Sequence, residues 1–207
     1  MSESAPISET ETLPSAAQKV RTYGDPVLRK PVRQVTDPSS LQALVAEMWE
    51  VMYAANGVGL AAPQIGVSQQ VAVLLKLSDN EQEPPQELVL VNPRLLEASS
   101  ETELMEEGCL SFPGIYLTVA RPRRVVVEFW DLDGNHQQVE AEGFFAREFL
   151  HEIDHLGGRL IIDRAERAAL EEKRPEIEVL RRETRQRLKA QGQAKPKSAK
   201  VQRRQAP

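Results

Sequence analysis

Five consecutive residues carry the pattern with the clearest chemical meaning, His151-Glu152-Ile153-Asp154-His155. In a helix, residues four apart lie one above the other on the same face, so both imidazoles could bind one metal ion. Glu152 could then reach a water molecule at that ion and act as a general base. This H-E-x-x-H pattern predicts metal-assisted hydrolysis, but it does not identify the bond that is cleaved.

A third ligand is needed, because a catalytic metal ion is usually held by three protein ligands with one position left open. His136 follows a turn at Asp133-Gly134, where a polar side chain is usually solvated. Cys109, the one cysteine of the chain, lies between Gly108 and Gly114, which allow close backbone approach. A lone cysteine is most often a small buried hydrophobic residue. Beside a two-histidine helix, however, the ligand is the better interpretation.

A thiolate ligand changes what is expected of Glu152. The thiolate partly neutralises a divalent ion, so a water molecule there is less acidified than beside three neutral imidazoles. A carboxylate that accepts the water proton therefore becomes more important, and it can later deliver that proton to a leaving amine. The alternative for Glu152 is an exposed helix charge, which its position between the two histidines disfavours.

A glycine-rich segment covers residues 57–66, with the sequence GVGLAAPQIG. It lacks the Lys-Ser/Thr ending of a phosphate-binding loop and does not match the dinucleotide-binding fingerprint. Its small residues would let the backbone pass close to a ligand or to another strand. A packed turn is the alternative interpretation.

Hydrophobic spacing and turn signals predict the elements that position these residues. Helical spacing covers Leu41–Ala55, and Phe144–Leu156 is the helix that carries the two histidines. A last helix is expected from near Arg164 to about Ala190, with a break or restart at Pro175. Strands are predicted at Val71–Leu75, Leu88–Val91, Arg123–Trp130 and Gln137–Glu142.

The first two predicted strands are separated by a loop over Asp79–Gln86, and the last two form a hairpin. Strands in the first part of the chain followed by a helical end predict an α+β fold rather than alternating βαβ units. A length of 207 residues suits one domain with tails.

Composition bears on where the protein works. No apolar run approaches the ~20 residues of a membrane span, so a membrane is not an expected partner. The N-terminus has no basic residue before Lys19 and contains Glu3, Glu9 and Glu11, which fits neither a secretory signal nor a transit peptide. A single cysteine suits a reducing compartment. The expectation is a cytoplasmic protein.

Charge is unevenly distributed along the chain. Residues 173–207 contain twelve Lys or Arg and three Glu, a net charge of +9, whereas residues 1–172 carry −14. A basic end on an acidic body suggests an anionic partner for that end. A solvated helix with a disordered end explains the pattern equally well.

Taken together, three segments resemble the signature motifs of the peptide deformylases: GVGLAAPQ at 57–64, EGCLS at 107–111 and HEIDH at 151–155. They occur in the family's order, and the resemblance covers about residues 19–170. It implies removal of the formyl group from the N-terminal formyl-methionine of new polypeptides, with release of formate. The extent of the resemblance predicts a catalytic domain 19–170. Composition and spacing add a disordered segment 1–18, a basic helix 171–191 and a disordered basic tail 192–207.

The resemblance also implies the fold and the metal. Antiparallel or mixed sheets would pack around a central metal-binding helix, with a further helix at the C-terminus. Cys109, His151 and His155 would bind the metal, and Glu152 would act as general base and then as general acid. The family's metal is typically Fe(II), replaceable by nickel, cobalt or zinc. Ligand chemistry alone would favour zinc.

Two further sets of residues have roles implied by the resemblance. The side-chain amide of Gln64 and the backbone N–H of Leu110 would stabilise the oxyanion that develops during hydrolysis. The N-formylmethionyl peptide would bind in extended form beside a third set of residues: Val58, Gly59, Glu107 and Gly108.

The chain departs from the family pattern just before the first histidine. Members usually have Gln where this chain has Leu150, and a small or apolar residue where it has Glu148. If Glu148 faces the pocket for the methionine side chain, its charge disfavours an apolar group there. If it faces outward, the departure has no consequence.

Two other hypotheses remain open on the sequence. A metallopeptidase or amidase of another type could share H-E-x-x-H alone, although most such peptidases use His or Glu as the third ligand. In addition, residues 173–207 could bind the ribosome or its RNA, since the substrate emerges there and the segment is basic. Phosphate contacts would make that binding strongly salt dependent.

Overall fold

The computed structural model describes residues 15–77 and 84–192. The predicted tail 193–207, most of the predicted N-terminal segment and residues 79–83 of the predicted loop lie outside the described residues. The limit of 18 for a disordered N-terminus is wrong, because Ala17–Lys19 form a 3-10 helix and both Ala16 and Ala17 are buried.

Two antiparallel sheets confirm the α+β prediction. A five-stranded sheet has the order β1-β2-β3-β6-β7, and β4 pairs with β5 in a second sheet. The strands are β1 Gly59–Ala61, β2 Val71–Lys76, β3 Gln86–Ala98, β4 Thr102–Glu107, β5 Leu117–Pro122, β6 Arg124–Trp130 and β7 His136–Glu142. The sequence analysis did not predict β1, β4 or β5.

Strand β3 is much longer than the predicted Leu88–Val91, and it bends midway. Its pairing with β6 shifts register after Val91 and again after Leu95. Asn92 has a left-handed backbone, with φ of 51°. The Asn92 side chain forms two hydrogen bonds with the backbone of Val35. Its Oδ1 accepts from the Val35 N–H at 2.9 Å, and its Nδ2 donates to the Val35 C=O at 2.8 Å. Such irregularities bend a strand, so β3 pairs with β2 at one end and with β6 at the other.

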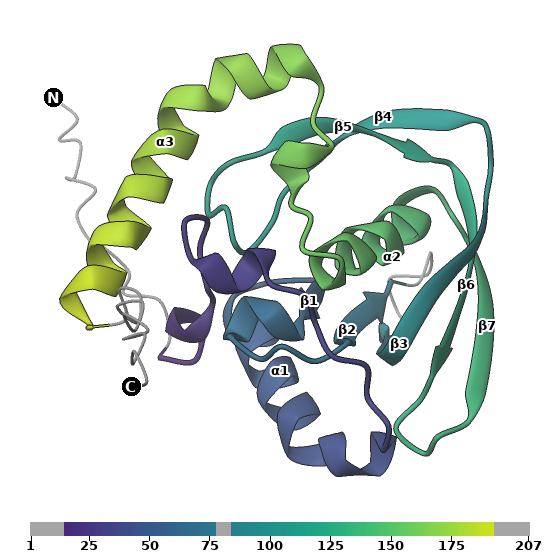
Figure 1. Cartoon of the computed structure of the whole chain (residues 1–207). Coiled ribbons are helices and arrows are strands. Elements are labelled where there is room, and N and C mark those ends of the chain that lie inside the picture. The colour runs from purple at the N-terminus through teal and green to yellow at the C-terminus, as the bar shows by residue number, and fades with distance from the viewer. Residues whose placement is uncertain (1–14, 78–83, 193–207) are drawn as a thin grey trace, which may run out of the picture.

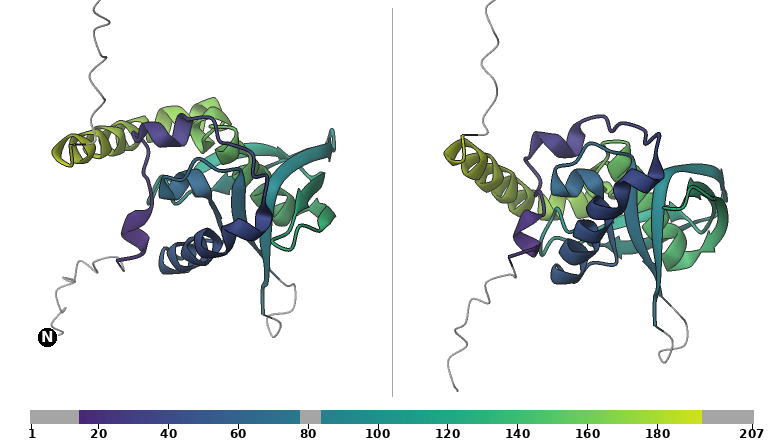
Figure 2. Two further views of the ribbon diagram at one scale, coloured as in Figure 1. Left: turned by 60° about the horizontal axis from the view of Figure 1, so that its bottom comes forward. Right: turned by 90° about the horizontal axis from the view of Figure 1, so that it is seen from below.

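Helix α2, Gly143–Leu156, confirms the predicted histidine helix and lies inside the curve formed by the two sheets (Figure 1). Figure 2 shows from other sides that strands wrap around this helix. Ala146, Phe149 and Leu150 pack against β6 residues such as Val127 and Phe129. Because α2 is enclosed, several of its polar residues are buried too: Arg147, His151, Glu152, Asp154 and His155.

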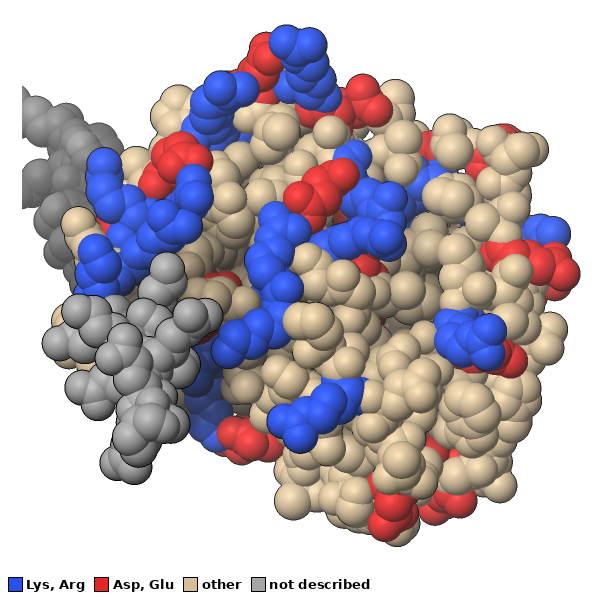
Figure 3. Space-filling model, in the orientation of Figure 1, with Lys and Arg blue, Asp and Glu red and all other residues tan. Residues whose placement is uncertain are grey.

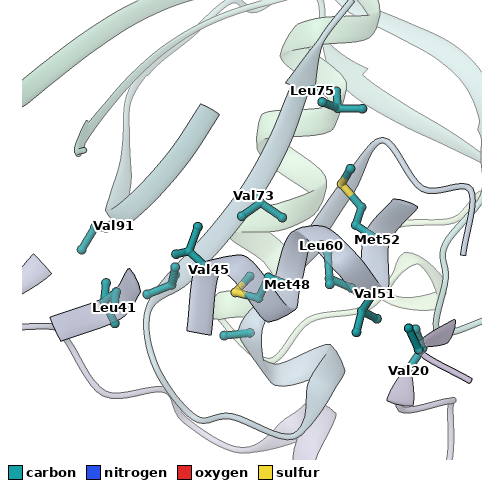
Figure 4. Close-up of a cluster of buried hydrophobic side chains, with 13 residues drawn as sticks. Val20, Leu41, Val45, Met48, Val51, Met52, Leu60, Val73, Leu75 and Val91 are labelled. Atoms are coloured by element: carbon teal, nitrogen blue, oxygen red, sulfur yellow. The ribbon is translucent and has the colours of Figure 1, made fainter. Parts of the chain in front are cut away.

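Helix α1, Gln42–Ala54, packs on the other face of the five-stranded sheet and confirms the predicted helix 41–55. Its side chains at helical spacing point toward β1 and β2, as Figure 4 shows for Val45, Met48 and Met52. The facing residues include Leu60 and Val73, both without exposed surface. This core fixes β1, which carries part of the glycine-rich segment.

Helix α3 spans Arg167–Ala190 without interruption, so the predicted break at Pro175 is wrong. Proline removes one backbone hydrogen bond from a helix, and the packing of buried Ile177, Thr184 and Leu188 maintains the remaining turns. The predicted boundary at residue 171 falls inside this helix. Thr184 Oγ1 lies 2.6 Å from Thr22 Oγ1, which attaches α3 to the N-terminal segment.

No helix within the described ranges 15–77 and 84–192 is long and apolar enough to cross a membrane. The cytoplasmic location stays a prediction.

Candidate active site

Helix α2 and the turn after β4 bring three metal-ligand side chains together. The rings of His151 and His155 are 5.0 Å apart between centroids, one turn apart on one helix face. Cys109 Sγ lies 3.2 Å from His155 Nε2. The ligand atoms of Cys109, His151 and His155 all lie within 4.8 Å of one another. His136 is elsewhere, on β7, where its Nε2 lies 3.1 Å from Glu128.

The charges around this group suit a bound cation. Burial lowers the pKa of His155 to about 4, so its imidazole is neutral at pH 7. Burial also acts to lower the pKa of His151, but the negative charges of Cys109 and Glu107 raise it well above its ordinary value. A divalent cation bound at this group would balance the buried negative charge beside His151. The three residues therefore fit a metal site.

Glu107 holds His151 in place from behind. Its carboxylate is 3.2 Å from His151 Nδ1, which leaves Nε2 for the metal. It also accepts from Arg121 Nε at 2.8 Å and from Arg147 at 2.7 Å. Burial acts to raise the pKa of Glu107, but the hydrogen bonds from His151 and Arg121 outweigh burial and hold the pKa below its ordinary value. The carboxyl group is therefore ionised. The Glu107 side chain thus lies behind the metal ligands rather than on the cavity wall, where a substrate role was predicted.

Arg121 and Arg147 also take part in contacts that hold α2 against the β4-β5 sheet. Arg121 on β5 bonds Asp154 on α2 at 2.5 Å, and Arg164 bonds the same carboxylate at 2.7 Å. Arg147 donates to the backbone oxygens of Val119 and Glu103. Sequence reasoning missed this network. The available signal was that Arg147 and Asp154 lie on an otherwise buried, metal-binding helix.

We expect Glu107→Gln to weaken metal binding by about 10–100-fold, because residues that orient a metal ligand typically contribute that much. A neutral amide would hold His151 less firmly and would leave two buried guanidinium groups poorly compensated. Competition with a chelator of known affinity measures the effect. Glu106→Gln, the same change at the exposed neighbouring position, is the matched control. Equal metal affinity in both variants would exclude the orienting role.

Glu152 is the buried carboxylate beside the ligands. Its side chain is almost fully enclosed, and Oε2 has no hydrogen-bond partner among the described residues. The backbone of Gly59 lies directly against this carboxylate, where a Cβ atom would clash with Oε1. Burial raises the pKa of Glu152 to about 7, and electrostatic interactions with His151 and His155 oppose this rise. A carboxylate so placed can exchange a proton near neutral pH.

Two hydrogen-bond donors belong to residues beside the ligand group, Gln64 and Leu110. Gln64 lies in the short 3-10 helix Ala62–Ile65, and its Oε1 accepts from the Ala61 N–H at 2.8 Å. This bond directs Nε2 toward Ser111 Oγ, at 3.2 Å, and toward Cys109 Sγ, at 3.7 Å. The Leu110 N–H has no acceptor within the described part of the chain. Ser111, fully buried, was not among the predicted site residues.

A cavity of about 990 Å³ opens beside these groups. Of the predicted substrate-binding residues, Val58, Gly59 and Gly108 line it. Glu148 lines it too, and burial raises the pKa of that carboxyl against the opposing charge of His151. Leu150 instead packs into the apolar core around α2. Of the two departures, only Glu148 can therefore affect what the cavity binds.

A sequence model of the polypeptide deformylase family matches residues 17–171. The chain belongs to this family. Peptide deformylase of Thermotoga neapolitana is 48% identical over 147 residues, which cover 70% of this chain and 85% of that protein. Peptide deformylase of Thermosynechococcus vestitus is 42% identical over 164 residues, covering 78% of this chain and 86% of that protein.

Solved structures of peptide deformylases share the fold. The enzyme from Thermus thermophilus has a TM-score of 0.72 and 42% identity, covering 80% of this chain and 98% of its own. An Arabidopsis thaliana deformylase has a TM-score of 0.75 and 36% identity, covering 86% of this chain and 96% of its own. The chain is thus a deformylase, a hydrolase of protein biosynthesis, and its Cys109, His151 and His155 form a group that could hold a metal ion.

Proposed function

We propose that this enzyme removes the formyl group from the N-terminal formyl-methionine of new polypeptides, using Fe(II) held by Cys109, His151 and His155. The observation that carries the proposal is that the three ligand atoms, within 4.8 Å of one another, adjoin Glu152 and Gln64 at one cavity. Membership of the deformylase family supports the reaction class.

A divalent ion bound there would polarise the formyl carbonyl and acidify a water molecule. Glu152 accepts a proton from the water molecule as the water oxygen attacks the formyl carbon. The Nε2–H of Gln64 and the N–H of Leu110 donate to the carbonyl oxygen as negative charge develops on it. When the C–N bond breaks, Glu152 returns the proton to the leaving amine. The products are formate and a free amino terminus.

The decisive test is an assay of a formyl-Met tripeptide against the same peptide without the formyl group. Formate release from the first peptide, with no cleavage of the second, is the expected result. Cleavage of the unformylated peptide bond would instead support a metallopeptidase. Metal analysis of protein purified without air tests the ion, because a ferrous thiolate site should lose activity in air. Full activity after long exposure to air would contradict Fe(II).

We expect Glu148→Leu to raise kcat/KM for a formyl-Met tripeptide by about fivefold, mainly through KM, since relieving a poorly solvated polar group contributes about 1 kcal/mol. The half-buried carboxylate lines the cavity that we assign to the methionine side chain. Steady-state kinetics measure the change, and Glu148→Gln separates loss of charge from loss of polarity. Unchanged or weaker binding in Glu148→Leu would place the methionine elsewhere.

We also propose that the basic C-terminal region contacts the ribosome or its RNA. Five basic residues on α3 are exposed and form no ion pair with another described residue: Arg174, Arg182, Arg185, Arg187 and Lys189. Figure 3 shows basic side chains gathered over α3, with acidic ones between them. Clustered cations of this kind bind phosphate backbones in a salt-dependent manner.

Truncation after Ala190 is expected to spare activity on free peptides and to weaken co-sedimentation with ribosomes. The cut leaves α3 intact, because the helix ends at Ala190. It removes five further basic residues, Lys195, Lys197, Lys200, Arg203 and Arg204. Sedimentation at two salt concentrations measures the effect. Equal co-sedimentation of the full and truncated chains would rule out a role for the tail.

A further inference from the structure

One face of α3 forms the outer wall of the active-site cavity. Its lining residues on that helix recur at helical spacing: Leu180, Glu183, Thr184 and Arg187. Pockets of about 300–1,000 Å³ hold whole drug-sized ligands, and this cavity has about 990 Å³. Formyl-methionine is smaller than such a ligand, so the cavity has room for further residues of the substrate.

A second groove continues the cavity along α3. It has a volume of about 490 Å³ and lies between α3 and the loop 113–115, which follows the Cys109 motif. Figure 1 shows the connection between β4 and β5 reaching toward α3. The groove adjoins the cavity, because the two share five lining residues: Pro113, Gly114, Ile115, Leu180 and Glu183. The α3 groove, as we call it, also includes Pro175, Glu176 and Val179.

The chemistry of the α3 groove suits an extended peptide. Its floor is apolar, and Val179 is 40% exposed although it is a large apolar side chain on a packed helix. Glu183 forms no ion pair with another described residue, whereas Glu178, on the same helix, pairs with Arg181 at 3.3 Å. An unpaired carboxylate beside an apolar strip favours a peptide with a basic side chain.

We propose that the part of the polypeptide downstream of the formyl-methionine binds in the α3 groove, with Glu183 favouring basic residues there. The proposal rests on the proposed function, since it extends the path of the same substrate. An extended chain advances ~3.3 Å per residue, so successive residues of the substrate move away from the metal ligands toward this adjoining groove. Substrate selection therefore extends to α3, beyond the metal centre.

The test compares a formyl-Met dipeptide with a formyl-Met hexapeptide that carries lysine in its second half, using the metal-loaded full chain. Glu183→Lys is expected to lower kcat/KM for the hexapeptide about fivefold more than for the dipeptide, because attraction to the lysine side chains becomes repulsion. Val179→Asp should also impair the hexapeptide alone. Glu178→Lys, the same charge change just outside the groove, is the matched control and should change neither substrate.

Equal effects on both substrates would overturn the proposal, because α3 would then only support the cavity. So would no effect on either substrate, which would leave the α3 groove to another partner. A wild-type enzyme that releases no formate from the dipeptide would contradict the proposed function instead. The failures of the two proposals are therefore distinguishable.

Discussion

Replacing Glu152 by Gln is expected to lower kcat for deformylation by about 10²–10⁴-fold, the usual contribution of a general acid–base group. Gln has nearly the same shape, so it fits the space against the Gly59 backbone that the carboxylate occupies. It cannot accept the water proton or return it to the amine. Because Glu152 is not one of the three clustered ligands, metal content should stay at the wild-type level.

Measurement of kcat together with the metal-to-protein ratio tests this prediction. Glu148→Gln is the matched control, since it makes the same chemical change one turn earlier on α2 and also lines the cavity. We expect that control to change kcat by less than about fivefold. A Glu152→Gln enzyme with near-normal kcat would require another base. Loss of activity together with loss of metal would show that Glu152 helps to hold the ion.

The second large effect is expected from Cys109→Ala, which should weaken metal binding at least about 100-fold and abolish activity with it. Loss of a ligand weakens metal binding more than loss of a residue that orients a ligand, and the latter typically lowers metal affinity by about 10–100-fold. The two remaining histidines sit on one helix and leave the opposite side of the site without a donor. A thiolate also supplies the negative charge that balances a divalent ion.

Metal analysis after gel filtration measures this loss, with His136→Ala as the control. His136 lies on β7 beside Glu128, away from the ligand cluster, so its removal should leave the metal content unchanged. Cys109→Ser tests whether a small polar ligand restores part of the affinity. Wild-type metal content in Cys109→Ala would refute the proposed ligand set.

Local spacing was sufficient to predict much of this molecule. The two-histidine helix, α1 and the β6-β7 hairpin were predicted to within about two residues at either end. The reason is that helical and strand periodicities record which face of a single element is buried. His151, Glu152 and His155 share one turn of one helix, so their common site follows from the helix alone.

Other parts of the fold left weaker local signals. Strand β4 was missed because four of its six residues are exposed and its pattern is not apolar. Strand β3 was predicted too short, because its second half is mostly exposed beyond the bend near Asn92. Helix α3 passes through Pro175, where the sequence predicted a break, since tertiary packing outweighs the loss of one hydrogen bond.

The sequence by itself predicted metal-assisted hydrolysis from the H-E-x-x-H pattern. The resemblance of three motifs to those of the peptide deformylases then implied the specific reaction. Only the tertiary structure decided how they meet. Cys109 and His155 are 46 positions apart, yet Sγ and Nε2 lie 3.2 Å from each other. The position of Glu107 behind His151, the fit of Gly59 against Glu152 and the α3 wall of the cavity are likewise long-range contacts. Periodicity describes each element separately, whereas such contacts and the burial that shifts a pKa depend on the packing of the whole chain.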